Sequence, residues 1–189
     1  MFNKVLAAAV LLATPAMAQD VPDLPGPNLV IEVSGQAQGE IVIDLLPDVA
    51  PKHVAQIVAL AKSGAYDGVV FHRVIEGFMA QTGDVQYGKA GGDLSMAGMG
   101  GSEMPDIPLE ASNLSFDRGI VGMARAMDPD SANSQFFIMF APSPNLDGQY
   151  TVFGRVIKGM EVVDAIKKGT GGNGEVTDPD VMAKVTVQE

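Results

Sequence analysis

The sequence predicts a mainly β fold, either an antiparallel barrel or a sandwich, with two helices covering its open ends. About eight short apolar runs are separated by turns that contain Gly or Pro, which is typical of strands. Two segments show the three-to-four-residue apolar period of a helix. Strands and helices do not alternate along the chain, so a parallel β-sheet with crossover helices is not expected.

Length and composition indicate a single globular domain. The chain has 189 residues, of which 47% are hydrophobic and 19% charged, with 22 Gly and 12 Pro. This composition provides a core and many turns, unlike that of a disordered chain. There is no cysteine, so disulfides, thiol catalysis and thiolate metal sites are excluded. The net charge of −11 argues against nucleic acid or anionic membranes as partners.

The N-terminal residues 1–18 have the features of a secretory signal peptide. Lys4 precedes an apolar run over residues 5–13 that is too short to span a bilayer, and Ala16-Met17-Ala18 is a typical cleavage site. A buried N-terminal helix is the less favoured alternative. We expect cleavage after Ala18, a periplasmic mature protein without membrane insertion, a flexible segment over residues 19–28, and a folded domain over residues 29–189.

The folded part begins with a strand pair and a helix. Residues 29–33 and 40–45 predict a hairpin. Asp48 is the candidate N-cap of the first helix, Pro51 suits its first turn, and Gly64 suits its C-terminal cap. The expected buried stripe is Val54, Ile57, Val58 and Ala61, and the expected outward face is Lys52, Gln56 and Lys62.

Residues 71–84, FHRVIEGFMAQTGD, predict two short strands separated at Glu76-Gly77. Because strand side chains alternate between faces, Arg73 should share a face with Phe71 and Ile75. An arginine on an apolar face either reaches out to water or lines a cavity that uses its donors.

The remaining chain predicts a long loop, four strands and a second helix. Residues 87–108 are rich in Gly and Met and show no period, which indicates a loop. The strands are expected at residues 118–126, 134–140, 150–157 and 181–187, and the helix at residues 159–168. Within the second of these strands, Gln135 should share a face with Phe137 and Met139.

Two other motifs do not indicate a cofactor or metal site. Residues 169–174 spell G-x-G-x-x-G, but they follow a helix and open none, so a dinucleotide site is not expected. His53 and His72 are too few for a histidine metal site, and His72 is interpreted as a structural hydrogen-bonding residue. We predict no metal and no cofactor.

Three polar donors, Arg73, Gln81 and Gln135, interrupt strands that are otherwise apolar. Each alone is more typical of a satisfied or snorkelling side chain. Together with neighbouring aromatic and Met side chains, they favour a groove that binds a peptide or another ligand.

Four segments, FHRVIEGFMAQTGD, GIVGMARA, SANSQFFIMF and LDGQYTVFGRVIKGMEVVD, resemble the signature segments of the cyclophilin family of peptidyl-prolyl isomerases. The similarity runs in order from about residue 29 to the C-terminus. It implies an eight-stranded antiparallel closed β-barrel capped by two α-helices, with a groove on its outer surface. A bend or bulge at Gly77 would then let Phe78 and Met79 face the same groove.

The resemblance also assigns roles to residues. Arg73 would be the catalytic donor, and Gln81 would orient it or hold the substrate carbonyl. The implied substrate-binding residues are Phe78, Met79, Ala124, Arg125, Ala126, Gln135, Phe137, Leu146 and Tyr150. Two positions depart from the family: Asn145 replaces a common tryptophan, which predicts weak cyclosporin binding, and Tyr150 replaces a histidine found in many eukaryotic members.

The leading hypothesis is an exported prolyl isomerase that acts on unfolded or extended proline-containing polypeptides and assists their folding. A chaperone or scaffold in which isomerisation is incidental is the main alternative. An exported barrel that binds a small ligand is a weaker one, because no cofactor motif is present. Nothing in the sequence requires more than a monomer.

Overall fold

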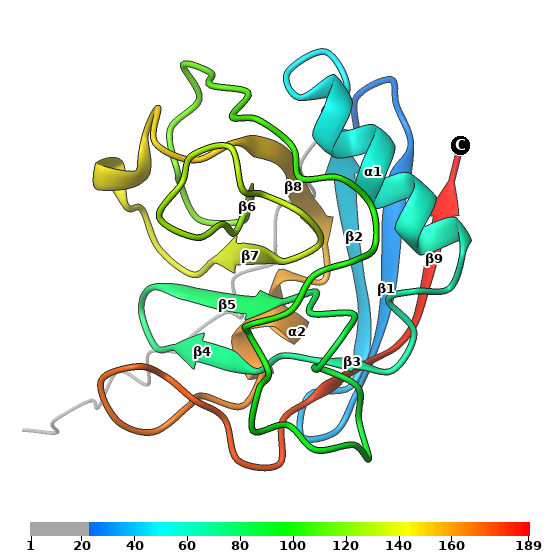
Figure 1. The fold of residues 1–189 in the computed structure, drawn as a ribbon, viewed down its shortest axis with the longest axis vertical. Coiled ribbons are helices and arrows are strands. Elements are labelled where there is room, and N and C mark those ends of the chain that lie inside the picture. Colours follow the sequence, from blue (N-terminus) through cyan, green and yellow to red (C-terminus); the bar gives the residue numbers. More distant parts are fainter. Residues whose placement is uncertain (1–22) are drawn as a thin grey trace, which may run out of the picture.

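The computed structural model describes residues 23–189, which form one antiparallel nine-stranded sheet with two α-helices (Figure 1). The sheet order is β3-β9-β1-β2-β8-β6-β7-β5-β4. The strands are β1 (Asn28–Ser34), β2 (Gly39–Leu45), β3 (Val69–Val70), β4 (Arg73–Ile75), β5 (Met79–Thr82), β6 (Ile120–Met123), β7 (Phe136–Met139), β8 (Val152–Lys158) and β9 (Val181–Gln188). The helices are α1 (Pro51–Lys62) and α2 (Met160–Ala165), and a 3-10 turn, η1, covers Pro144–Leu146.

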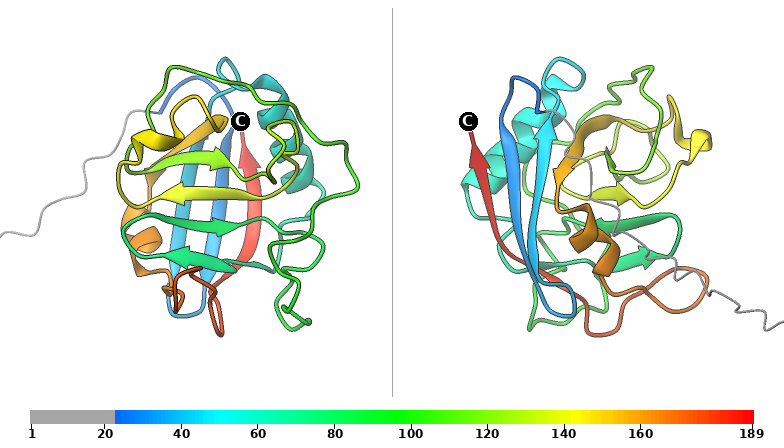
Figure 2. Two further views of the ribbon diagram at one scale, coloured as in Figure 1. Left: turned by 60° about the vertical axis from the view of Figure 1, so that its left-hand side comes forward. Right: turned by 180° about the vertical axis from the view of Figure 1, so that it is seen from behind.

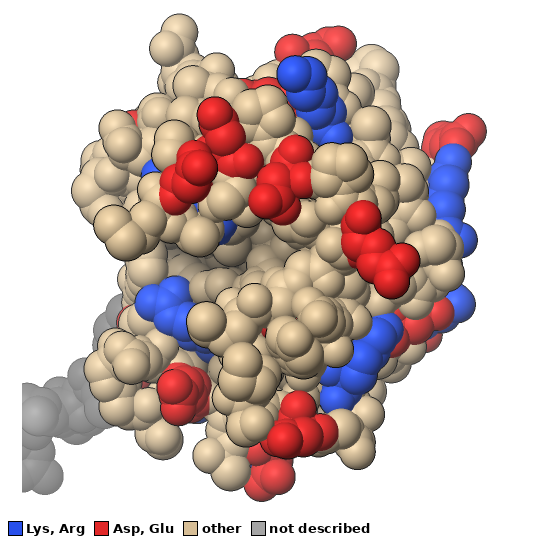
Figure 3. Space-filling model, viewed as in Figure 1, with Lys and Arg blue, Asp and Glu red and all other residues tan. Residues whose placement is uncertain are grey.

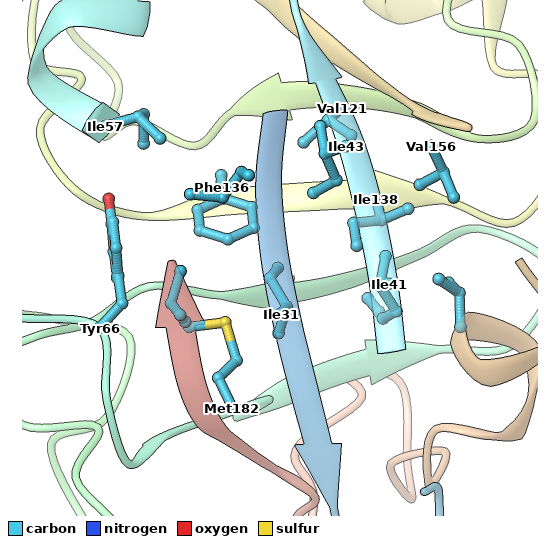
Figure 4. Packing of buried hydrophobic residues seen from close by; sticks show 14 of the residues in the cluster. Ile31, Ile41, Ile43, Ile57, Tyr66, Val121, Phe136, Ile138, Val156 and Met182 are labelled. Carbon is cyan, nitrogen blue, oxygen red and sulfur yellow. The ribbon is translucent and has the colours of Figure 1, made fainter. Parts of the chain in front are cut away.

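The sheet curls into a half-barrel. Strands β6, β7, β5 and β4 cross steeply over β2, β1 and β9, with the core between the two halves (Figure 2, left). Aliphatic and aromatic side chains from both halves interdigitate there, among them Ile31, Ile43, Phe136 and Ile138 (Figure 4). All four are fully buried. The predicted mainly β, antiparallel fold is therefore confirmed.

The expected closed, eight-stranded barrel is wrong. The sheet has nine strands and is open between its edges, β3 and β4. These two strands are consecutive in the chain and are separated only by Phe71 and His72, while β3 pairs with β9 and β4 pairs with β5. A strand cannot hydrogen-bond to its own continuation, so this bend places the two edges next to each other without a ladder between them.

Side chains alternate across β5 and β7 as the strand period predicts. Ala80 and Thr82 are fully buried, and Ala80 belongs to the main core, as do Phe136 and Ile138 of β7. Met79, Phe137 and Met139 belong instead to a second apolar cluster on the outer face of the sheet. Phe71 breaks the expected pattern: it lies in the main core and does not share the face of Arg73, because the bend between β3 and β4 separates them.

Helix α1 starts at Pro51, but its N-terminus is not capped by Asp48. The N-cap residue is Ala50, which makes no side-chain cap. The carboxylate of Glu110, from a distant loop, accepts hydrogen bonds from the backbone of Lys52 (3.1 Å) and His53 (3.1 Å). A carboxylate at a helix N-terminus satisfies free N–H groups and complements the helix dipole.

Gln56 of α1 was expected to point outward, and this is wrong. It is 7% exposed, and its amide donates to the carbonyl oxygens of Pro105 (3.2 Å) and Asn133 (3.0 Å). The long loop crosses the helix here and buries a position that the helical period assigns to solvent. Of the predicted stripe, Val54, Ile57 and Ala61 are buried as expected, and Val58 is partly buried against the core.

The second helix is shorter than predicted. Helix α2 begins after Gly159, which has a φ of 83°, and ends at Ala165. Lys168 lies just beyond its end, where its ammonium donates to the carbonyl oxygens of Asp164 and Ile166. The two helices lie on opposite sides of the core (Figure 2, left).

The predicted signal peptide over residues 1–18 and part of the segment over residues 19–28 lie outside the described residues. At the described end, Pro27 accepts a hydrogen bond from Leu45 N (3.1 Å), and Asn28 already belongs to β1. Neither helix within residues 23–189 has the length and apolar character needed to cross a membrane.

Candidate active site

A groove lies on the outer face of the half-barrel, over β5 and β7. In the sheet register, Gln81 of β5 stands beside Arg73 of β4 on one side and Phe137 of β7 on the other. Figure 3 shows a hollow over β7, with acidic side chains on the rim above it. Antiparallel pairing thus brings an arginine, a glutamine and an aromatic ring from three strands onto one face.

The groove consists of two adjoining hollows. The first has a volume of about 200 Å³ and an apolar floor that belongs to the outer cluster. Its lining residues are Arg73, Phe78, Met79, Gln81, Ala124, Arg125, Phe137, Leu146 and Tyr150. All nine are among the eleven site residues expected from the sequence.

The second hollow, of about 510 Å³, shares Gln81, Ala124 and Arg125 with the first. Ala126 and Gln135, the remaining two expected residues, line this one. Its other walls come from the loop residues 98–102 and from Asp106, Ser131, Asn133 and Ser134. The structure therefore brings all the expected residues to one continuous groove.

The Arg73 guanidinium is held at two of its nitrogens. Nη1 donates to Gln81 Oε1 (3.1 Å) and lies 3.9 Å from Met79 Sδ, and Nε donates to the carbonyl oxygen of Asn173 (2.9 Å). Within residues 23–189, no hydrogen bond involves Nη2. Its two N–H groups are therefore available to a ligand in the groove.

A relay of amide groups connects Arg73 to the long loop. Gln81 Nε2 donates to Gln135 Oε1 (3.0 Å), and Gln135 Nε2 donates to the carbonyl oxygens of Gly98 (3.0 Å) and Gly100 (2.7 Å). Each amide uses its oxygen for the bond toward Arg73 and its nitrogen for the next acceptor. This directional chain fixes the orientation of both glutamines.

The carboxylate of Asp84 organises the loop end of this relay. Asp84 is fully buried, and its Oδ2 accepts the N–H groups of Gly98 (2.8 Å) and Gly100 (2.9 Å). Its Oδ1 accepts the N–H groups of Gln86 (3.0 Å) and Tyr87 (2.8 Å). Four N–H donors satisfy the buried charge and close the loop on itself.

Aromatic rings that pack against one another support the apolar floor of the first hollow. Phe137 stacks on Phe116, with centroids 5.7 Å apart, and meets Tyr150 edge to face at 5.9 Å. The Arg125 guanidinium lies 4.5 Å from the centroid of Tyr150. Asn145 is exposed in η1 and lies outside the lining of both hollows.

The turn between β4 and β5 explains how Phe78 and Met79 reach the same hollow. Gly77 has a φ of 72°, and Phe78 N donates to Ile75 O (3.0 Å), which closes a tight turn. Phe78 therefore lies in the turn and does not follow the strand alternation that begins at Met79. A left-handed φ at this position favours glycine.

His72 lies beneath the loop, and its imidazole is buried. It is 8% exposed, and neither ring nitrogen has a hydrogen-bond partner within the described residues. A Cβ atom on Gly98 would lie 3.1 Å from the imidazole, so the loop packs directly against the ring. Burial lowers the pKa of His72 to about 4, so the imidazole is neutral at pH 7.

The sequence did not predict the groups that hold the site residues and the loop in place through hydrogen bonds. Asp84 had a usable signal, because it is an acidic residue at the end of an apolar strand. Gly98, Gly100 and Asn173 contribute carbonyl oxygens, which every residue has, so no residue type marks them. Ser131, whose hydroxyl accepts the N–H of Ala126 (3.0 Å), was also missed.

Comparison with known proteins identifies the family of this chain. Residues 29–187 match the family described as cyclophilin type peptidyl-prolyl cis-trans isomerase/CLD. A "Probable peptidyl-prolyl cis-trans isomerase" of Brucella suis is 50% identical over 186 residues, covering 97% of this chain and 94% of its own length. The Arabidopsis thaliana "Peptidyl-prolyl cis-trans isomerase CYP18-1" is 39% identical over 72% of this chain and 82% of its own.

Solved structures give the same result. A cyclophilin from Hirschia baltica superposes with a TM-score of 0.68 at 25% identity, over 84% of this chain and 73% of that one. A cyclophilin-type isomerase of Cryptosporidium parvum, solved in the presence of the dipeptide Ala-Pro, gives a TM-score of 0.73 at 27% identity, over 86% of this chain and 99% of that one. The chain therefore belongs to the cyclophilin-type peptidyl-prolyl cis-trans isomerases.

Proposed function

We propose that this isomerase acts on unfolded or extended segments of exported proteins, and that the outer groove is where it turns their X-Pro bonds. The signal-like residues 1–18 support the exported location. The groove is an open surface hollow and suits a passing chain segment. The Ala-Pro dipeptide of the Cryptosporidium parvum structure points to the same class of ligand.

The reaction requires little chemistry. Amide resonance sets a rotation barrier of about 18–20 kcal/mol, so uncatalysed exchange takes roughly tens to hundreds of seconds. No covalent bond breaks, so no nucleophile is needed. The enzyme must bind the twisted amide more tightly than either planar form.

Arg73 is the proposed source of that selectivity. As the amide twists, the prolyl nitrogen becomes pyramidal and regains a lone pair that can accept a hydrogen bond. The free Nη2 of Arg73 can donate to this nitrogen, while Gln81 and Asn173 hold the other guanidinium nitrogens. A donor already in place costs no reorganisation when the bond twists.

The proline ring would occupy the first hollow, against Phe137, Leu146 and Met79. The residues before proline would run past residues 124–126 into the second hollow. The N–H groups of Ala124 and Ala126 already bond to Gln135 O (2.9 Å) and Ser131 Oγ (3.0 Å). The main chain of Arg125, between them, is therefore the proposed partner for the peptide backbone.

The test is a protease-coupled assay on an Ala-Pro peptide, comparing wild type with Arg73→Ala. Loss of one transition-state hydrogen-bond donor should lower kcat/KM by about 100-fold or more. Arg73→Lys keeps the charge but not the planar fork, so it should recover little of the rate. Equal rates for wild type and Arg73→Ala, with both folded by circular dichroism, would overturn the catalytic assignment.

A chaperone activity is the second candidate, and two exposed side chains favour it. Met99 is 76% exposed on the wall of the second hollow, and Met127, next to Ala126, is 97% exposed. Flexible Met side chains suit binding of varied apolar segments. If Arg73→Ala abolishes turnover but still protects an aggregating client, binding is the main activity.

Export is tested directly by expressing the full chain and fractionating the cells. The expected outcome is a periplasmic protein that begins at Gln19, as N-terminal sequencing would show. A cytoplasmic protein that retains Met1 would contradict this part of the proposal. The same sample, passed through a size-exclusion column with light scattering, tests the expected monomer.

A further inference from the structure

The glycine-rich segment over residues 169–175, GTGGNGE, lies along the outer side of β4. Gly169 N donates to Val74 O (2.8 Å), and Val74 N donates to Gly174 O (2.7 Å). One residue further, Val176 N donates to His72 O (3.2 Å). This segment therefore covers the edge of the sheet that β5 leaves open, which satisfies the backbone groups of β4.

The same segment also reaches the side chain of Arg73. The carbonyl of Asn173 accepts the Nε–H of Arg73 at 2.9 Å, on the opposite side of the guanidinium from Gln81. A single hydrogen bond leaves a long arginine side chain free to turn about the bond. Two bonds at different nitrogens of a planar group fix both its position and its plane.

We propose that residues 169–175 are a positioning element for catalysis, in which the Asn173 carbonyl locks Arg73 so that Nη2 faces the substrate. This inference rests on the proposed role of Arg73 and extends it to a segment outside the lining of both hollows. Gln81 and the loop relay hold one side of the guanidinium, and Asn173 holds the other.

The glycines show which positions this arrangement requires. Gly174 has a φ of 72°, and a Cβ atom there would lie 2.9 Å from Val74 O and closer still to the Ile75 side chain. A side chain at position 174 must therefore push the segment away from β4, and the adjacent Asn173 carbonyl would move with it. Gly172 has no left-handed φ, and a Cβ atom there would meet nothing within 4 Å.

This contrast provides a matched pair of variants in one loop, Gly174→Ala and Gly172→Ala. A shift of about 1 Å in a catalytic group can cost up to about 100-fold in rate, so Gly174→Ala should lower kcat by about 10- to 100-fold. KM should change less than two-fold, because the lining of the first hollow does not include this segment. Gly172→Ala should keep kcat within about two-fold of wild type.

A nitrogen-15 NMR spectrum of the arginine side chains supplies a readout that stability alone does not move. In wild type, the Arg73 Nε–H signal, assigned by its loss in Arg73→Lys, should exchange slowly with water because it is hydrogen-bonded. It should remain slow in Gly172→Ala and become fast in Gly174→Ala, while the backbone amide spectrum stays folded. The wild-type spectrum tests the contact even if Gly174→Ala does not fold.

The outcomes separate this inference from the proposed function. If Arg73→Ala keeps the wild-type rate, the catalytic role of Arg73 fails, and the positioning element fails with it. If Arg73→Ala is inactive but Gly174→Ala keeps the full kcat, only the positioning element is overturned. A fast-exchanging Nε–H in wild type would also overturn it, whereas a parallel loss of kcat and of the slow signal in Gly174→Ala supports it.

Discussion

Replacement of Asp84 by asparagine should loosen the long loop and slow catalysis without unfolding the domain. The buried carboxylate accepts four backbone N–H groups, two at each oxygen. Asparagine keeps one acceptor oxygen and presents an NH₂ donor to the other two N–H groups. At about 1.5 kcal/mol for each lost bond to a charged group, the loop is destabilised by about 3 kcal/mol.

This cost falls on the loop rather than on the whole fold. All four donors to Asp84 are backbone N–H groups of residues 86–100, so the loop can open while the core stays packed. A loss of about 3 kcal/mol corresponds to roughly 100-fold faster hydrogen exchange at the amides of Gly98 and Gly100. Their carbonyls also hold Gln135, so the relay to Arg73 should loosen, and kcat/KM should fall by about 10-fold.

The assays are hydrogen exchange by NMR and the protease-coupled isomerase assay, with Asp93→Asn as the control. Asp93 lies in the same loop but is exposed and accepts the nearby N–H of Ser95 (2.9 Å). We expect this control to match wild type in both assays. Unchanged exchange at Gly98 and Gly100 in Asp84→Asn would refute the anchoring role, and faster exchange with an unchanged kcat/KM would refute the relay.

Three further predictions concern other parts of the site. Burial lowers the pKa of His72 from 6.5 to about 4 in the folded protein. As the pH falls, His72 therefore becomes protonated at a higher pH in the unfolded chain than in the folded protein. The free energy of unfolding should therefore be highest above pH 6.5 and fall by up to about 3 kcal/mol toward pH 4. Denaturant melts at several pH values should show this loss in wild type and a smaller loss in His72→Leu. Tyr150→Phe should keep kcat/KM within about two-fold of wild type, because the ring itself packs on Phe137 and Arg125. Tyr150→Ala, which removes the ring, should lower kcat/KM by about 3- to 10-fold. Equal losses in the two variants would assign the role to the hydroxyl instead. Cyclosporin should inhibit the wild type weakly, and Asn145→Trp should tighten inhibition by about 10-fold or more in the same assay, an expectation that an unchanged inhibition constant would contradict.

Where the chemistry depends on strand alternation, the sequence was a sufficient guide. A two-residue period is a local property, so it placed Met79 and Gln81 on one face of β5, and Gln135 and Phe137 on one face near β7. The cyclophilin resemblance then predicted which faces meet. The structure puts all of these side chains around one groove.

Where the outcome depends on contacts between distant segments, the sequence was a poor guide. The helical period assigned Gln56 to solvent, but the long loop crosses α1 and supplies two carbonyl acceptors for it. The barrel was expected to close, but the bend at Phe71 and His72 splits one strand into two that pair with different neighbours. Neither result follows from a residue's own neighbours in the chain.

The sequence by itself determined the strand faces, the polar donors among them and the family to which they point, because side-chain type and local spacing carry that information. Only the tertiary structure decided how Arg73 is held. Its partners include the carbonyl of Asn173, which lies 100 residues away in the chain, and a relay that ends at Gly98 and Gly100. Backbone carbonyls are the same in every residue, so their positions become known only when the chain is folded.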